Sequence, residues 1–77
     1  MKIKFDRKAD AVYVYFSNEP VFYTKKLDDM RYIDYAEDGS PIGVELLCVS
    51  DGVNTDDLPN KAEIERALGD RGIRVYA

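Results

Sequence analysis

The chain has 77 residues, a net charge of −4, one cysteine and no histidine. A chain of this length forms one small domain that buries about 60–65% of the surface its unfolded form exposes. The single cysteine excludes an intrachain disulfide, and the absence of histidine excludes Ser-His-Asp and Cys-His catalytic sites and His-containing metal sites within one chain. The N-terminal residues contain no apolar run of signal-peptide or membrane-span length, so we expect a cytoplasmic protein that does not bind a membrane.

The charge is unevenly distributed along the chain. Residues 28–60 contain nine acidic residues and one basic residue, a net charge of −8, whereas residues 1–27 have a net charge of +3 and residues 61–77 of +1. Nucleic-acid binding relies mainly on lysine and arginine set against phosphates. With a pI of about 4.7 and no basic run, we expect no nucleic-acid partner.

The N-terminal third predicts three strands. Lys2–Phe5 alternates polar and apolar residues, Ala11–Phe16 is dense in β-branched and aromatic types, and the short polar segment between them predicts a hairpin turn. Pro20 interrupts the second strand because it has no N–H. Val21–Leu27 then resumes an extended pattern, and its lysines suggest an edge strand that discourages further pairing.

The middle of the chain predicts a second hairpin. Arg31–Ala36 and Pro41–Leu47 alternate in polarity on either side of Glu37–Ser40, where Asp38 and Gly39 are suited to the positive φ angles of a tight primed turn.

A polar connection over residues 50–57 leads to the only helical pattern, Leu58–Gly69. Asn60 and Glu63 have the spacing of a capping box, and Gly69 is placed to end the helix in the left-handed conformation. Ile73–Tyr76 alternates again and predicts a terminal strand.

These elements predict an α+β fold: a mostly antiparallel sheet arranged as a five-strand meander over residues 1–50, followed over 51–77 by a loop, one helix and a short strand. The period of two gives the sheet two faces. The inner, apolar face contains Ile3, Phe5, Val12, Val14, Phe16, Ile33, Tyr35, Ile42, Val44 and Leu46. The outer face collects Tyr13, Tyr15, Tyr32, Asp34, Gly43, Glu45 and Leu47.

The outer face is the predicted functional surface. Tyr13, Tyr15, Tyr32, Asp34, Glu45 and Leu47 are the candidate interface residues, because tyrosine is enriched at protein contacts and its neighbours here are acidic. Asp34 and Glu45 lie on adjacent strands within cross-strand or diagonal reach, so they are also candidates for a divalent-cation site or an acid–base pair. The alternative is that both carboxylates serve only as solvated surface groups. Cys48 lacks a histidine base and is expected to be a partly buried thiol.

Two segments together resemble a known family. The segment DRKADAVYVYF, from Asp6 to Phe16, and the segment RYIDYAEDGSPIGVELL, from Arg31 to Leu47, are similar to a small prokaryotic family called domain of unknown function 2283. The matching residues are Asp6, Asp10, Ala11, Tyr13 and Phe16 in the first segment and Ile33, Asp34, Asp38, Gly39, Gly43 and Glu45 in the second. The family has no established activity. Some members are encoded beside small candidate toxins, and the resemblance therefore implies an antitoxin-like role as a partner protein.

The leading interpretation is a non-enzymatic interaction domain that forms a homo-oligomer, most simply a dimer, through its sheet. One alternative is an antitoxin-like protein that binds a neighbouring gene product. A second alternative is a cation-binding or acid–base site at Asp34 and Glu45. No cofactor is expected.

Overall fold

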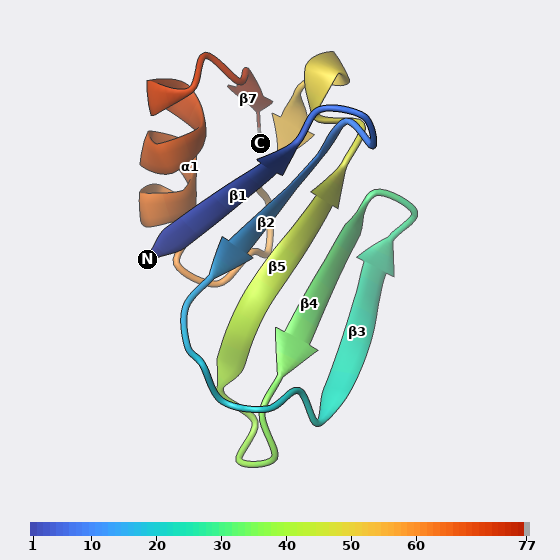
Figure 1. Cartoon of the computed structure of the whole chain (residues 1–77), viewed down its shortest axis with the longest axis vertical. Coiled ribbons are helices and arrows are strands. Elements are labelled where there is room, and N and C mark those ends of the chain that lie inside the picture. The colour runs from blue at the N-terminus through green and yellow to red at the C-terminus, as the bar shows by residue number, and fades with distance from the viewer. Residues whose placement is uncertain (77) are drawn as a thin grey trace.

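A computed structural model describes residues 1–76, which form a five-stranded antiparallel sheet with the remaining elements on one side of it (Figure 1). The strands are β1 (Lys2–Asp6), β2 (Ala11–Tyr15), β3 (Tyr23–Asp28), β4 (Arg31–Tyr35) and β5 (Pro41–Leu47). They are followed by a 3₁₀ turn η1 (Val49–Asp51), β6 (Val53–Asn54), α1 (Lys61–Asp70) and β7 (Val75–Tyr76). The predicted α+β class is confirmed. Within residues 1–76, no helix is long and apolar enough to cross a membrane.

The order of the strands, β1-β2-β5-β4-β3, differs from the predicted meander. After β2, residues 16–22 run along the lower end of the sheet to its far edge (Figure 1), and β3, β4 and β5 then return as two hairpins that place β5 beside β2. This is a Greek key arrangement. The backbone N–H groups of Phe16 and Ser17 both donate to the Ile42 carbonyl, at 2.7 and 3.3 Å. These bonds hold the end of β2 beside β5, so β2 does not form a hairpin with β3.

The turn between β4 and β5 is also of a different type from the one predicted. The Gly39 N–H donates to the Ala36 carbonyl at 2.9 Å, and the Ala36 N–H donates to the Ser40 carbonyl at 2.9 Å. Gly39 has a φ of +86°, but Asp38 does not have a positive φ. The connection is therefore a three-residue hairpin loop with glycine in the left-handed position, and not a two-residue primed turn.

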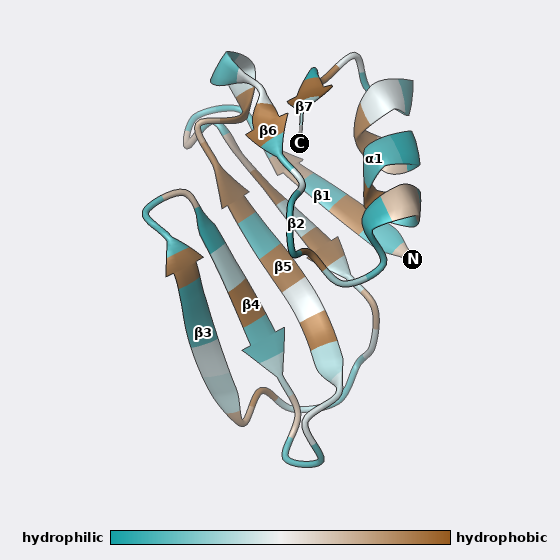
Figure 2. Cartoon of the chain, turned by 180° about the vertical axis from the view of Figure 1, so that it is seen from behind, coloured by the Kyte–Doolittle hydropathy of each residue, from teal (hydrophilic) through white to brown (hydrophobic). Residues whose placement is uncertain are grey.

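The core lies between the inner face of the sheet and the C-terminal elements (Figure 2). Its buried residues are Val12, Val14, Ile33, Val44, Leu46, Val49, Val53, Leu58, Ile64 and Leu68. The predicted inner face is confirmed for most positions, but Phe5 is 40% exposed. Phe5 lies near the end of an edge strand, where it lines an open groove together with Ile73 and Arg74.

The helix begins and ends differently from the prediction. Asn60 is the N-cap, but its φ is +53° and its side chain makes no capping hydrogen bond, so the capping box does not form. Gly69 lies inside the helix. The left-handed residue that ends it is Gly72, with a φ of +74°. The Ile73 N–H donates to Leu68 and the Gly72 N–H to Gly69, each at 3.0 Å, which is a Schellman motif.

The terminal strand β7 does not join the main sheet. It pairs in parallel with β6, a two-residue strand inside the segment predicted to be only a loop. Arg31 supports this segment from β4. It is 8% exposed, and its guanidinium contacts Asp28 at 2.8 Å and donates to the carbonyls of Asn54 at 3.0 Å and Asp56 at 2.6 Å. Arg31 thus lies on the inner face and does not pair with the acidic residues of the outer face.

Candidate functional site

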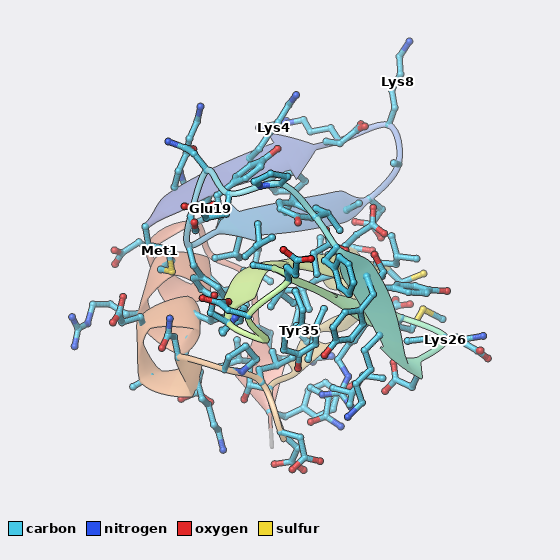
Figure 3. All side chains as sticks on the ribbon, turned by 90° about the horizontal axis from the view of Figure 1, so that it is seen from below. Met1, Lys4, Lys8, Glu19, Lys26 and Tyr35 are labelled. Atoms are coloured by element: carbon cyan, nitrogen blue, oxygen red, sulfur yellow. The ribbon has the colours of Figure 1, made fainter. Side chains whose placement is uncertain are left out.

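The outer face of the sheet carries the predicted site residues and is covered by no other element of residues 1–76 (Figure 1). Glu45 on β5 lies opposite Tyr13 on β2 and opposite Tyr32 on β4. Two residues earlier on β5, Gly43 lies between Tyr15 on β2 and Asp34 on β4. Leu47 lines the same surface near Tyr13 and Glu45. Figure 3 shows the two sides of the sheet, with Lys4 on the outer side and Tyr35 on the side of α1.

A hydrogen-bond network crosses four strands of this face. The Tyr13 hydroxyl on β2 donates to Asp34 Oδ2 on β4, and the Thr24 hydroxyl on β3 donates to Asp34 Oδ1 at 2.5 Å. Burial raises the pKa of the Tyr13 hydroxyl, and the bond to Asp34 raises it further. The hydroxyl therefore stays protonated at neutral pH, and Tyr13 acts as a donor that ties the strands together.

Gly43 makes this network possible. Tyr13 must pass over β5 to reach β4, and Gly43 is the β5 residue below its path. A Cβ at position 43 would lie 2.5 Å from Tyr13 Cε1 and 2.6 Å from its hydroxyl oxygen. A glycine at this point in a strand is therefore required by the close approach of another residue.

Asp34 and Glu45 are diagonal neighbours, because Asp34 lies opposite Gly43 and Glu45 opposite Tyr32. Diagonal pairs are about 7–8 Å apart, which is wider than the separation of directly opposed residues. Both oxygens of Asp34 already accept hydroxyl groups, whereas Glu45 is exposed. No cluster of three or more histidine, cysteine or acidic side chains suited to a metal ion occurs within residues 1–76.

The aromatic part of this face forms a shallow hollow of about 320 Å³ next to the β1–β2 turn. The rings of Tyr13 and Tyr15 lie 4.4 Å apart at a tilt of 52°, and the Lys2 ammonium lies 5.9 Å from the centre of the Tyr15 ring. Tyr13, Tyr15, Tyr32 and Leu47 are all half-buried. The face is therefore an ordered surface of packed rings, with acidic groups at its centre and lysines toward its edge.

Comparison with known proteins identifies the family to which this chain belongs. Residues 2–50 match the model of a family described as "Protein of unknown function (DUF2283)". The chain belongs to the DUF2283 family. No curated protein and no solved structure matches the chain.

The matched residues include the three members of the hydrogen-bond network, Tyr13, Thr24 and Asp34, and also Gly43. The family match also includes Asp6 and Asp10, which shape the β1–β2 turn of this DUF2283 protein. Asp6 accepts the Ala9 N–H at 3.1 Å, and Asp10 accepts both the N–H of Ser50, at 3.1 Å, and its hydroxyl, at 2.6 Å. The turn was predicted from the sequence, but its long-range attachment to Ser50 was not.

One exposed feature of this DUF2283 protein was missed by the sequence analysis. Val21 and Phe22 are 52% and 63% exposed, and Tyr23 is also exposed. The Tyr23 ring stacks on Tyr35 with a centroid distance of 5.0 Å, and Phe22 meets Tyr23 edge-on at 6.2 Å. The sequence signal for this feature is the aromatic pair Phe22-Tyr23, which begins two residues after Pro20 and lies within the predicted edge strand Val21–Leu27.

Proposed function

We propose that this DUF2283 protein is a non-enzymatic interaction domain that self-associates through the outer face of its sheet. The observation that carries the proposal is that this face of the five-stranded sheet has no covering layer in residues 1–76, although it presents packed tyrosine rings. A sheet usually packs against a second layer, and a second copy supplies one by face-to-face packing.

The size of the face sets the expected strength of association. Five strands about 4.8 Å apart and about 17 Å long present a flat area of roughly 400 Å². A standard protein interface buries about 800 Å² on each partner. Tyr13, Tyr15 and Tyr32 supply rigid aromatic contacts, but Glu45 at the centre carries a charge. We therefore propose a weak, concentration-dependent dimer.

Sedimentation velocity from about 10 μM to 1 mM tests this proposal, since that range covers free energies of binding of about 4 to 7 kcal/mol. Tyr15→Lys and Tyr32→Lys place a charge on the face without removing the bond between Tyr13 and Asp34, and both variants should shift the equilibrium to monomer. Phe22→Ser, which lies outside this face, is the matched control and should leave association unchanged. A parent protein that remains a monomer at 1 mM, or a dimer that survives both lysine variants, would refute the proposal.

A second candidate function is that of an antitoxin-like protein that binds a neighbouring gene product. The acidic middle of the chain, residues 28–60, favours it, because a net charge of −8 is complementary to a basic partner. Co-expression with that gene product and co-purification at micromolar concentration test this role.

The cation or acid–base alternative at Asp34 and Glu45 has less support, because Asp34 is engaged in the network. The cation-binding version of this alternative predicts that Ca²⁺ or Mg²⁺ raises the melting temperature of the parent and not of Asp34→Asn.

A further inference from the structure

The lower end of the molecule carries a groove that is separate from the outer face of the sheet (Figure 3, which looks onto this end). Two adjoining hollows of about 250 and 410 Å³ share Glu19, Ala36 and Glu37. The first is completed by Pro20, Val21 and Phe22, and the second by Asp38 and Ser40. The groove thus runs between the 16–22 connection and the β4–β5 turn, with an apolar half and an acidic half.

The apolar half is exposed but ordered. Phe22 is 63% exposed, and its ring is supported through Tyr23 by the stack on Tyr35. The Phe22 N–H also donates to the Tyr35 carbonyl at 2.8 Å, which fixes the backbone beside the groove. Exposed aromatic side chains that are already held in place lose little entropy when a partner covers them, and such residues often dominate binding energy.

The acidic half contains three carboxylates, those of Glu19, Glu37 and Asp38. Within residues 1–76, none of them takes part in a salt bridge. Asp38 accepts the N–H of Ser40 at 2.9 Å and its hydroxyl at 2.7 Å, and these bonds lower the pKa of Asp38. The groove therefore presents concentrated negative charge beside Phe22 at neutral pH.

We propose that this groove binds a segment of a partner protein in which an apolar side chain lies next to lysine or arginine. The apolar side chain would cover Phe22 and Val21, and the basic side chain would face Glu19 and Glu37. A neutral or acidic segment would leave three carboxylates partly desolvated without a counter-charge, which is unfavourable. The apolar half of the groove therefore favours an apolar side chain of the partner, and the acidic half favours a basic one.

NMR titration of the ¹⁵N-labelled full chain with three synthetic hexapeptides of equal length tests the proposal. The probes are Lys-Leu-Arg-Phe-Lys-Leu, its acidic counterpart Glu-Leu-Glu-Phe-Glu-Leu, and its polar counterpart Lys-Ser-Arg-Ser-Lys-Ser, each with blocked termini. We expect the first peptide to bind at least tenfold more tightly than the other two. This peptide should shift the amide signals of Glu19, Phe22 and Glu37, and added salt should weaken its binding.

Matched variants locate the binding site. Phe22→Ser and Glu37→Lys should each weaken the first peptide about tenfold. Met30→Ser removes an exposed apolar side chain in the β3–β4 turn, and Glu63→Lys reverses an exposed charge on α1, so both should leave its affinity unchanged. Equal affinity for the three peptides, signal shifts confined to another surface, or no shift at about 1 mM peptide would each overturn the proposal. Self-association of the parent that Phe22→Ser abolishes would also overturn it, because the groove would then bind a second copy. The proposed dimer through the outer face is measured separately by the Tyr15→Lys and Tyr32→Lys variants.

Discussion

The ring of Tyr13 occupies the space that a side chain at Gly43 would fill. A Cβ at Gly43 would lie 2.5 Å from Tyr13 Cε1 and 2.7 Å from the backbone carbonyl oxygen of Val14. The tyrosine side chain can move, but the carbonyl is held in the β2–β5 ladder. We therefore expect Gly43→Ala to lower the free energy of unfolding by about 2–3 kcal/mol, measured by urea denaturation.

A double-mutant cycle separates the two contacts at Gly43. If the ring causes part of the loss, Gly43→Ala should cost less in a Tyr13→Ala background, and the carbonyl contact should keep the rescue incomplete. Gly43→Ala with the stability of the parent would show that Tyr13 does not need this glycine.

The raised pKa of Tyr13 predicts a loss of stability at alkaline pH. Tyr13 keeps its proton in the folded state at a pH where the unfolded chain, with an ordinary pKa of 10.0, releases it. The unfolded state then binds fewer protons than the folded state, so the free energy of unfolding falls as the pH rises above about 10. Melting temperatures between about pH 8 and 11 measure this effect. Tyr13→Phe should be less stable at neutral pH and should show a shallower alkaline decline, whereas parallel curves for the two proteins would contradict the assignment.

Replacing Arg31 should destabilise the chain through the connection it supports. In Arg31→Met, the carbonyls of Asn54 and Asp56 lose their donor, and Asp28 loses its ion pair. We expect a loss of about 2–3 kcal/mol in the free energy of unfolding. Arg31→Lys should recover less than half of it, because one ammonium cannot reproduce the guanidinium fork.

Hydrogen exchange shows whether the loss of Arg31 acts on this region. The Val53 and Thr55 amides donate to Arg74 and Tyr76 in the β6–β7 pair. Their protection should fall further than that of the β2 amides in Arg31→Met. A uniform fall in protection would instead indicate a general effect on stability.

Replacing Gly69 or Gly72 with alanine should change the free energy of unfolding in opposite directions. Gly69 lies within α1, and a Cβ there meets no atom within 4 Å, so Gly69→Ala should raise the free energy of unfolding by about 0.5 kcal/mol. Gly72 has a φ of +74°, so Gly72→Ala should lower the free energy by about 1 kcal/mol. Thermal denaturation of the two variants side by side provides the test. Effects of the same sign would contradict the assignment of Gly72 as the residue that ends the helix.

The alternation of side chains along each strand was sufficient to predict the two faces of the sheet. Val12 and Val14 are buried while Tyr13 lies between them on the other face, and Val44, Glu45 and Leu46 repeat the pattern on β5. This succeeds because the strand period alone decides which side chains point toward the core. It places Tyr13, Asp34 and Glu45 on one surface without knowledge of the strand order.

The strand order and the role of Arg31 depend on contacts that the sequence does not display. A break at Pro20 is compatible with either a hairpin or a crossing connection, and the choice rests on bonds from Phe16 and Ser17 to the distant Ile42 carbonyl. Arg31 begins a strand, where a charged residue is normally solvated. The cost of burying its charge is offset by hydrogen bonds to the backbone carbonyls of Asn54 and Asp56. Because every residue has a backbone carbonyl, nothing in the sequence marks these two as the partners of Arg31.

The stretch of sequence that matches the family is shorter than the stretch that forms the core. The family match ends at residue 50, yet Val53, Leu58, Ile64 and Leu68 supply four of the ten buried core residues. A chain ending at residue 50 would retain every family-matching residue and would leave the inner face of its sheet in water. In this protein, the sheet that the family match describes therefore has a dry inner face only because residues beyond the match cover it.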